Sequence, residues 1–203
     1  MKRFKLFANL MKEEAWINEQ MSSGYECTNI SPIGIYTFKK NSGASKIARI
    51  DYQNYMPHAK FHHYVAMHED FGWQHLAGSR WTGSQYWIKD ANGHDELFSD
   101  ATSTIAYFKR LMTHSLFTAI WMILFMTLLS TENNLFAKFY SIKAQYLTPG
   151  LWDKEGSAFW FSFLFETPFA MMRFLIPWFF VISAVMFIYS FIQYRKHLKN
   201  LTE

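Results

Sequence analysis

Two long stretches of the chain carry no charged side chain. The first runs from Leu111 to Thr131 and the second from Phe174 to Tyr194. A helix rises about 1.5 Å per residue, so about 20 apolar residues cross a hydrocarbon layer of about 30 Å. Neither stretch has the polar face that a surface helix of a soluble protein repeats at helical period. The pattern therefore predicts two transmembrane helices, at residues 111–131 and 174–194.

The aromatic segment just before the second stretch has two interpretations. Residues 157–173 are apolar enough to enter a membrane but too short to cross it and return before Arg173. The segment could be an interfacial aromatic helix at the level of the outer headgroups. Alternatively, it could be a kinked extension of the second span that bends at Pro168 and Pro177. We favour the interfacial helix.

The first hundred residues alternate between strand and helix patterns. Helices are expected at residues 12–23 and 57–71, because Gly24 and Gly72 follow them and Pro57 suits a first helical turn. Strands are expected between turn signals at residues 4–7, 25–30, 35–39, 46–52, 73–78 and 85–89. This order predicts an α+β domain, an antiparallel sheet with two helices on one face and a ferredoxin-like arrangement.

The basic residues lie mainly beside the apolar stretches. The formal charge is +4, but this distribution is typical of membrane topology and argues against a nucleic-acid partner. Basic residues stay on the cytoplasmic side, which predicts that both termini are cytoplasmic in a multi-pass protein of the cell (plasma) membrane. Three lysines in the connection, Lys138, Lys143 and Lys154, weaken this bias without reversing it.

These patterns divide the chain into seven parts. They are a cytoplasmic α+β domain (1–100), a juxtamembrane linker (101–110), transmembrane helix 1 (111–131), an extracytoplasmic connection (132–156), the interfacial aromatic helix (157–173), transmembrane helix 2 (174–194) and a cytoplasmic tail (195–203). The two spans would form a helical hairpin.

Several runs in the first half resemble a bacterial membrane-protein family defined by the domain of unknown function numbered 2812 (DUF2812). They are residues 4–7, 14–18, 24–25, 36–38, 49–52, 69–79, 85–86 and 97–100. The resemblance implies a cytoplasmic domain followed by membrane spans. It also implies genes that neighbour PadR-like transcriptional repressors. It brings no activity with it.

One run of the soluble part could carry acid–base chemistry. Glu69 and Asp70 precede Trp73 and His75, and a carboxylate near an imidazole is a common arrangement for proton transfer. The same run also suits a purely structural role, because Gly72 would end the helix and Trp73 would anchor the core. We favour the structural role and expect no catalytic residue here.

Metal and cofactor chemistry have weak support in the sequence. His58 and His62 stand four residues apart, but no third ligand has the close spacing of a specific metal motif. Cys27 is the single cysteine, and neither a dinucleotide-binding nor a phosphate-binding glycine motif is present. We therefore expect no cofactor and no metal.

Glu166 and Arg173 are the candidate functional residues of the apolar half. Seven residues separate them, so they would share one helical face and could pair if the helix is continuous. A pair inside the hydrocarbon would mark a functional site, whereas a pair at the headgroups would need no special role. We favour the headgroup position.

These observations favour a non-enzymatic integral membrane protein whose cytoplasmic domain binds a ligand or a partner. A regulatory, sensory or accessory role in an envelope-stress response would suit it. One alternative is an oligomeric small transporter or transporter subunit, and another is a membrane-anchored enzyme that uses Glu69, Asp70 and His75. The expected partners are the lipid bilayer and a membrane protein or a second copy of the chain.

The predicted orientation can be tested with reporter fusions. A reporter that is active only in the cytoplasm should be active when it is fused after residue 203 and inactive when it is inserted near residue 150, because the basic residues hold both termini inside. An active periplasmic reporter at residue 203 would contradict the hairpin.

Overall fold

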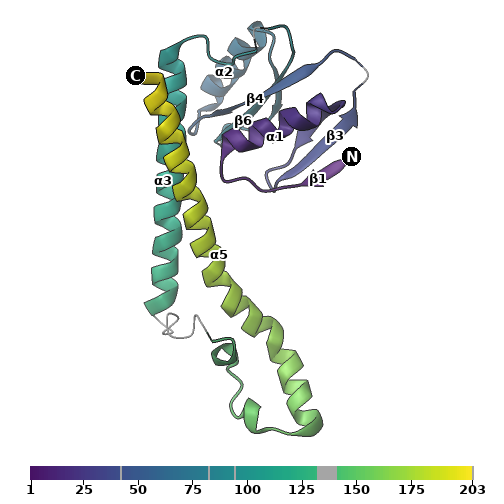
Figure 1. Ribbon diagram of the computed structural model, residues 1–203, viewed down its shortest axis with the longest axis vertical. Helices are drawn as coiled ribbons and strands as arrows, with labels where there is room; N and C mark the ends of the chain where they lie inside the picture. Colours follow the sequence, from purple (N-terminus) through teal and green to yellow (C-terminus); the bar gives the residue numbers. More distant parts are fainter. Residues whose placement is uncertain (42, 82, 94, 132–140, 203) are drawn as a thin grey trace. The chain divides into compact units, whose positions relative to one another are not determined.

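The computed structural model describes residues 1–41, 43–81, 83–93, 95–131 and 141–202 (Figure 1). The chain forms two compact units. The first joins Met1–His114 to Ser190–Glu203, and the second is Ser115–Tyr189. The α+β part thus recruits the beginning of one long apolar helix and the end of the other.

The α+β part consists of two motifs with the same topology. In the first, β1 (Lys2–Phe4), α1 (Leu10–Ser22), β2 (Tyr25–Ile30) and β3 (Ile35–Lys40) give an antiparallel sheet of order β1-β3-β2. In the second, β4 (Lys46–Tyr52), α2 (His58–Asp70), β5 (Gln74–Ala77) and β6 (Ser84–Asp90) give an antiparallel sheet of order β4-β6-β5. The fold therefore repeats one strand–helix–strand–strand motif.

The order of elements agrees with the sequence prediction, but the single ferredoxin-like sheet was wrong. The six strands form two sheets of three, which approach each other at β2 and β5. Side chains of α1 occupy the outer edge of β4. Asn18 both donates to the Ala48 carbonyl (3.0 Å) and accepts from the Ala48 N–H (2.8 Å), while Glu14 accepts from the Ile50 N–H (2.8 Å). These bonds satisfy backbone groups that another strand would otherwise use.

Local signals fix the two helices of this part. The Asn9 side chain caps α1 by accepting from the backbone N–H groups of Met11 (3.0 Å) and Lys12 (3.2 Å). The chain turns after α1 at Gly24, where φ is 86°, and after α2 at Gly72, where φ is 80°. Glycine adopts these positive φ values without the strain that a Cβ would bring. Both ends therefore agree with the glycine signals in the sequence.

The main core joins both sheets to the long helices. Ile17 of α1, Phe38 of β3 and Ile50 of β4 pack with side chains of α3 (Ala101–Thr131) and α5 (Gly156–Thr202). Leu111 and Tyr194, at the ends of the two charge-free stretches, are completely buried here. The Tyr194 hydroxyl also accepts from the backbone N–H of Leu10 at 2.7 Å. The expected boundary near residues 100–110 therefore lies inside a helix that continues into the core.

A buried carboxylate connects the two sheets. Glu13 of α1 is 5% exposed, and its Oε1 accepts from the hydroxyls of Tyr36 (2.7 Å) and Tyr86 (2.7 Å). Tyr36 belongs to β3 and Tyr86 to β6. Burial raises the pKa of Glu13, and the two hydroxyl bonds oppose that shift only in part.

The second unit contains the rest of both long helices and the segment between them. In the described part, two short 3-10 helices, η1 (Lys143–Gln145) and η2 (Leu151–Asp153), precede α5. Phe125 of α3 stacks on Phe180 of α5, with ring centroids 6.0 Å apart. By length and composition, α3 and α5 could both cross a membrane. Part of the predicted connection, residues 132–140, lies outside the described residues.

The sequence interpretation favoured for residues 157–173 does not match the helix that the chain forms. These residues and residues 174–194 belong to one continuous helix, α5, with Pro168 and Pro177 inside it. A continuous helix was the alternative interpretation, the kinked extension of the second span. The helix can continue through Glu166 and Arg173 because both charged side chains have hydrogen-bonding and ion-pair partners nearby, as described below.

The environment of Glu13 gives a prediction about pH and stability. Because its pKa in the folded state lies above the ordinary value, the associated stability is present at low pH and is lost as the pH rises through the folded pKa. Glu13→Gln keeps an acceptor oxygen without the charge. The variant should melt at a higher temperature than the natural chain at pH 7, and its melting temperature should vary less between pH 4.5 and pH 7.

The measurement is thermal unfolding of the full chain in detergent, followed by tryptophan fluorescence. Glu19→Gln, on an exposed position of the same helix, serves as the matched control and should behave like the natural chain. A lower melting temperature for Glu13→Gln at pH 7 would show that the Glu13 charge stabilises the fold.

Candidate functional site

A pocket of about 600 Å³ opens within the first unit. Its lining comes from α1, β4, residues 96–98, the beginning of α3 and the last turn of α5. Pockets of about 300–1,000 Å³ are the usual size for small-molecule ligands. The pocket is therefore the main candidate for a binding site in the α+β part.

The walls of the pocket are mostly apolar. Phe98 packs on Tyr107 with ring centroids 5.4 Å apart, and Tyr107 packs on Phe108 at 5.3 Å. The remaining apolar lining residues are Met11, Ala15, Ile50, Leu97 and Leu201. An apolar body with a few polar groups is the kind of ligand that such walls bind.

Most polar groups of the lining already have partners. Glu14 pairs with Arg49, whose Nη1 lies 3.2 Å from Glu14 Oε1 and also donates to the Ala48 carbonyl at 3.4 Å. Burial raises the pKa of Glu14, while the bond from Ile50 and the Arg49 charge lower it. Asn18 is held by Ala48, and the Thr104 hydroxyl donates to the Asp100 carbonyl at 3.1 Å.

Two polar side chains of the lining have no partner among the described residues. Tyr107 is 8% exposed, yet no described residue is within hydrogen-bonding geometry of its hydroxyl. In the described part, no fully buried side-chain oxygen or nitrogen lacks a partner, so this hydroxyl reaches open space, and Tyr107 lines the pocket. Glu96 is exposed and forms no ion pair with any described residue. These two groups are free to contact a ligand.

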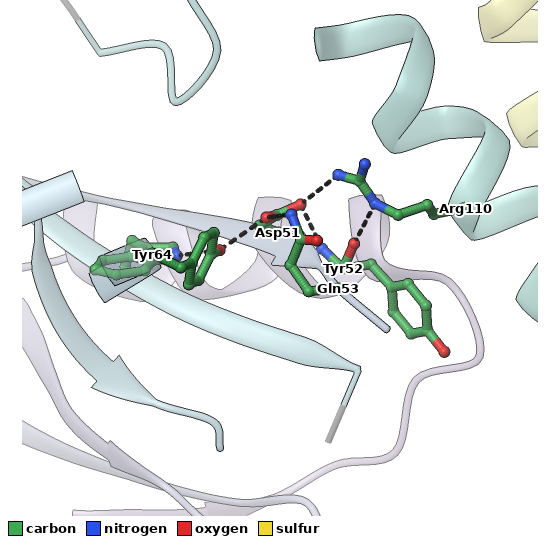
Figure 2. A network of polar contacts seen from close by, with 6 residues as sticks. Asp51, Tyr52, Gln53, Tyr64 and Arg110 are labelled. Atoms are coloured by element: carbon green, nitrogen blue, oxygen red, sulfur yellow. Dashed lines mark hydrogen bonds and ion pairs between the residues drawn. The ribbon is translucent and has the colours of Figure 1, made fainter. Parts of the chain in front are cut away.

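A polar network beside the pocket fixes the position of α3. Asp51 is completely buried at the end of β4, and Figure 2 shows the groups around its carboxylate. Oδ2 accepts from the Tyr64 hydroxyl (2.7 Å) and from Gln53 Nε2 (2.7 Å), and Oδ1 accepts from the Tyr52 N–H (2.7 Å). Arg110 of α3 lies 3.2 Å from Oδ1 and donates from Nε to the Tyr52 carbonyl at 2.6 Å.

Arg110 and Tyr107 stand three residues apart on α3, so they occupy neighbouring positions on that helix. The network also reaches α2 and β6, because Trp87 Nε1 donates to the Tyr64 hydroxyl at 3.3 Å. Burial and the charge of Asp51 raise the pKa of Tyr64 far above its ordinary value, so Tyr64 stays a neutral donor. The pocket wall is thus positioned from several elements of the α+β part.

The candidates of the Glu69–His75 run occupy different surroundings. Glu69 and Asp70 are exposed at the end of α2, whereas Trp73 is 3% exposed in a second core cluster with Met56, Tyr64 and Trp87. His75 lies on β5, where its Nε2 is 3.1 Å from Gln85 Oε1 and its ring is 4.8 Å from that of Trp87.

Glu69 and His75 interact electrostatically. Burial lowers the pKa of His75, and the bond to Gln85 and the charge of Glu69 partly oppose this. His68 of α2 is also buried, and burial lowers its pKa. None of the residues in the run lines the pocket.

The two charged candidates of the apolar half lie together. Arg173 is 3.3 Å from Glu166 on the continuous helix α5, which is the pair that their spacing allows in such a helix. Glu166 also accepts from the backbone N–H groups of Leu147 and Thr148, and Arg173 donates to the Gln145 carbonyl at 2.6 Å. His58 and His62 approach to 3.1 Å, but the described residues contain no group of three side chains arranged to hold a metal ion.

Sequence reasoning missed the pocket because its polar residues come from distant segments. Glu14, Arg49, Glu96 and Tyr107 are brought together only by folding. One signal was available: Glu14 and Asn18 stand four residues apart on α1, so they share a helix face with residues of the core.

The Asp51–Arg110 pair leads to a test by double-mutant cycle. Arg110→Met leaves a buried carboxylate without its cation and should destabilise the chain by about 3 kcal/mol, since breaking a buried pair from one side is costly. The double variant Asp51→Asn/Arg110→Met should lose less than the sum of the two single variants. Denaturant unfolding of the full chain in detergent measures both quantities.

The neighbouring exposed residue provides the control, because Lys109→Met should change stability by no more than about 0.5 kcal/mol. Strictly additive effects of the two single substitutions would mean that Asp51 and Arg110 do not stabilise each other.

Comparison with protein families gives a match over residues 9–120, to the family described as "Protein of unknown function (DUF2812)". Neither the curated proteins nor the solved structures contain a match. The matched region covers more than half of the chain, runs from the cap of α1 into α3, and includes Asp51, Arg110 and all polar residues of the pocket. The chain therefore belongs to the DUF2812 family.

Proposed function

We propose that this protein is a membrane-anchored receptor that binds a small, largely apolar ligand in the pocket of its α+β part. The observation that carries the proposal is the pocket itself. Its walls are apolar, its volume suits a small molecule, and the Tyr107 hydroxyl and Glu96 carboxylate lack partners among the described residues. In this proposal α3 and α5 cross the cell membrane, with both termini in the cytoplasm.

The lining also supports a sensory or regulatory role. Tyr107 and Phe108 belong to α3, and Leu201 belongs to α5, so a ligand would touch both apolar helices at their ends in the α+β part. A ligand shifts a conformational equilibrium only when it binds one state better than another. A ligand held partly by α3 and α5 would bind best when those two ends keep the arrangement that forms the pocket.

The test uses a neutral aromatic probe, 1-naphthalenemethanol, and the full chain in detergent. Equilibrium dialysis should show saturable binding to the natural chain. Ala15→Trp should weaken that binding at least tenfold, because Ala15 lines the pocket and an indole there would occupy space that the ligand needs.

The control is the same substitution outside the pocket. Ala59 is an exposed residue of α2, and Ala59→Trp should leave binding unchanged. The probe should also raise the melting temperature of the natural chain and of Ala59→Trp but not of Ala15→Trp, since binding to the folded state alone stabilises it. Equal binding by Ala15→Trp and the natural chain would rule out the pocket as the site.

A further inference from the structure

The charges around the pocket do not balance. Arg49 supplies one positive charge, and its ion pair with Glu14 neutralises that charge. Glu96 brings a second carboxylate to the lining, and no described residue forms an ion pair with it. The lining therefore carries an excess of one negative charge when both carboxylates are ionised.

The aromatic walls also favour a positively charged ligand. Phe98, Tyr107 and Phe108 form a contiguous group of three rings in the lining. The faces of such rings attract cations through their quadrupole, most strongly where water is excluded. An anion would meet both the ring faces and the unpaired carboxylate of Glu96 unfavourably.

The Tyr107 hydroxyl adds a specific polar contact. It is an acceptor as well as a donor, and it has no partner among the described residues although the side chain is more than nine-tenths buried. A protonated amine carries only donors, so it could bond to this hydroxyl oxygen, and the Glu96 carboxylate of the same lining would attract its charge. The apolar remainder of such a molecule would contact Met11, Leu97 and Leu201.

We propose that the pocket selects an apolar organic cation, with a single protonated amine in the lining that holds Glu96 and Tyr107 and an apolar body against the aromatic walls. This inference rests on the proposed function, because it names the class of ligand for the same pocket. The selectivity comes from one unbalanced carboxylate and three rings, so it should amount to about a tenfold preference, which corresponds to about 1.4 kcal/mol.

The test compares three probes that share one aromatic body. They are the cation 1-naphthylmethylammonium, the neutral 1-naphthalenemethanol and the anion 1-naphthoate. Their binding to the full chain is measured by equilibrium dialysis at pH 7 in a nonionic detergent, with Ala15→Trp protein in the same detergent as the blank for micelle partition. The cation should bind about tenfold more tightly than the neutral probe, and the anion more weakly than either.

Two substitutions locate the source of the preference. Glu96→Gln should reduce binding of the cation about tenfold and binding of the neutral probe by much less, whereas Glu19→Gln, outside the pocket, should change neither. Tyr107→Phe should weaken binding of the cation severalfold, while the aromatic walls keep their shape.

The outcomes separate the two proposals. If the neutral probe binds in the pocket but the anion binds as tightly as the cation, the ligand class is wrong and the binding function stands. If Glu96→Gln leaves cation binding unchanged, Glu96 does not select the ligand and the inference fails. If Ala15→Trp binds all three probes like the natural chain, the proposed function itself fails.

Discussion

The ion pair between Asp51 and Arg110 is the contact on which the α+β part most depends. A completely buried carboxylate is costly unless charged and hydrogen-bonding groups surround it, and Asp51 has both. Its partners come from the end of β4, from α2 and from α3, so one side chain holds three elements in register. Because Arg110 also donates to the Tyr52 carbonyl, α3 is fixed in position and in rotation about its axis.

The pocket follows from that fixed rotation. Tyr107 lies on α3 one turn before Arg110, and its ring forms a wall that α1 and β4 complete. Elsewhere in the same lining, the side chains of Asn18 and Glu14 form hydrogen bonds with the backbone of β4. The aromatic wall is left with a free hydroxyl, and the rim is left with the carboxylate of Glu96. The pocket therefore combines apolar walls with two polar groups that have no partner among the described residues.

Local sequence patterns predicted the order of the strands and helices of the α+β part and the presence of two long apolar helices, because periodicity, glycine and proline act over short distances. The bounds were less accurate: the first strand was expected at residues 4–7 but is Lys2–Phe4, and both apolar helices are longer than the spans predicted inside them. They did not predict that α1 closes the edge of β4, since the bonds of Asn18 to Ala48 join residues 30 positions apart. Hydropathy also cannot distinguish lipid from a protein core, so Leu111 and Tyr194 looked like membrane residues although they are buried against α1 and β3. The sequence did not show that α5 is continuous, because the partners of Glu166 and Arg173 are backbone groups of a preceding segment. These are the N–H groups of residues 147 and 148 and the carbonyl of residue 145.

The bond between Tyr194 and the backbone of Leu10 has a consequence for how the chain folds during synthesis. It joins residues 184 positions apart, and closing so long a loop is slow compared with forming local contacts. The strands and helices near the amino terminus leave the ribosome first, but their core lacks a wall until residues 190–203 have been made. The α+β part therefore completes its folding only after both apolar helices have been synthesised, and an interrupted chain would present an open core to the chaperones of the cell.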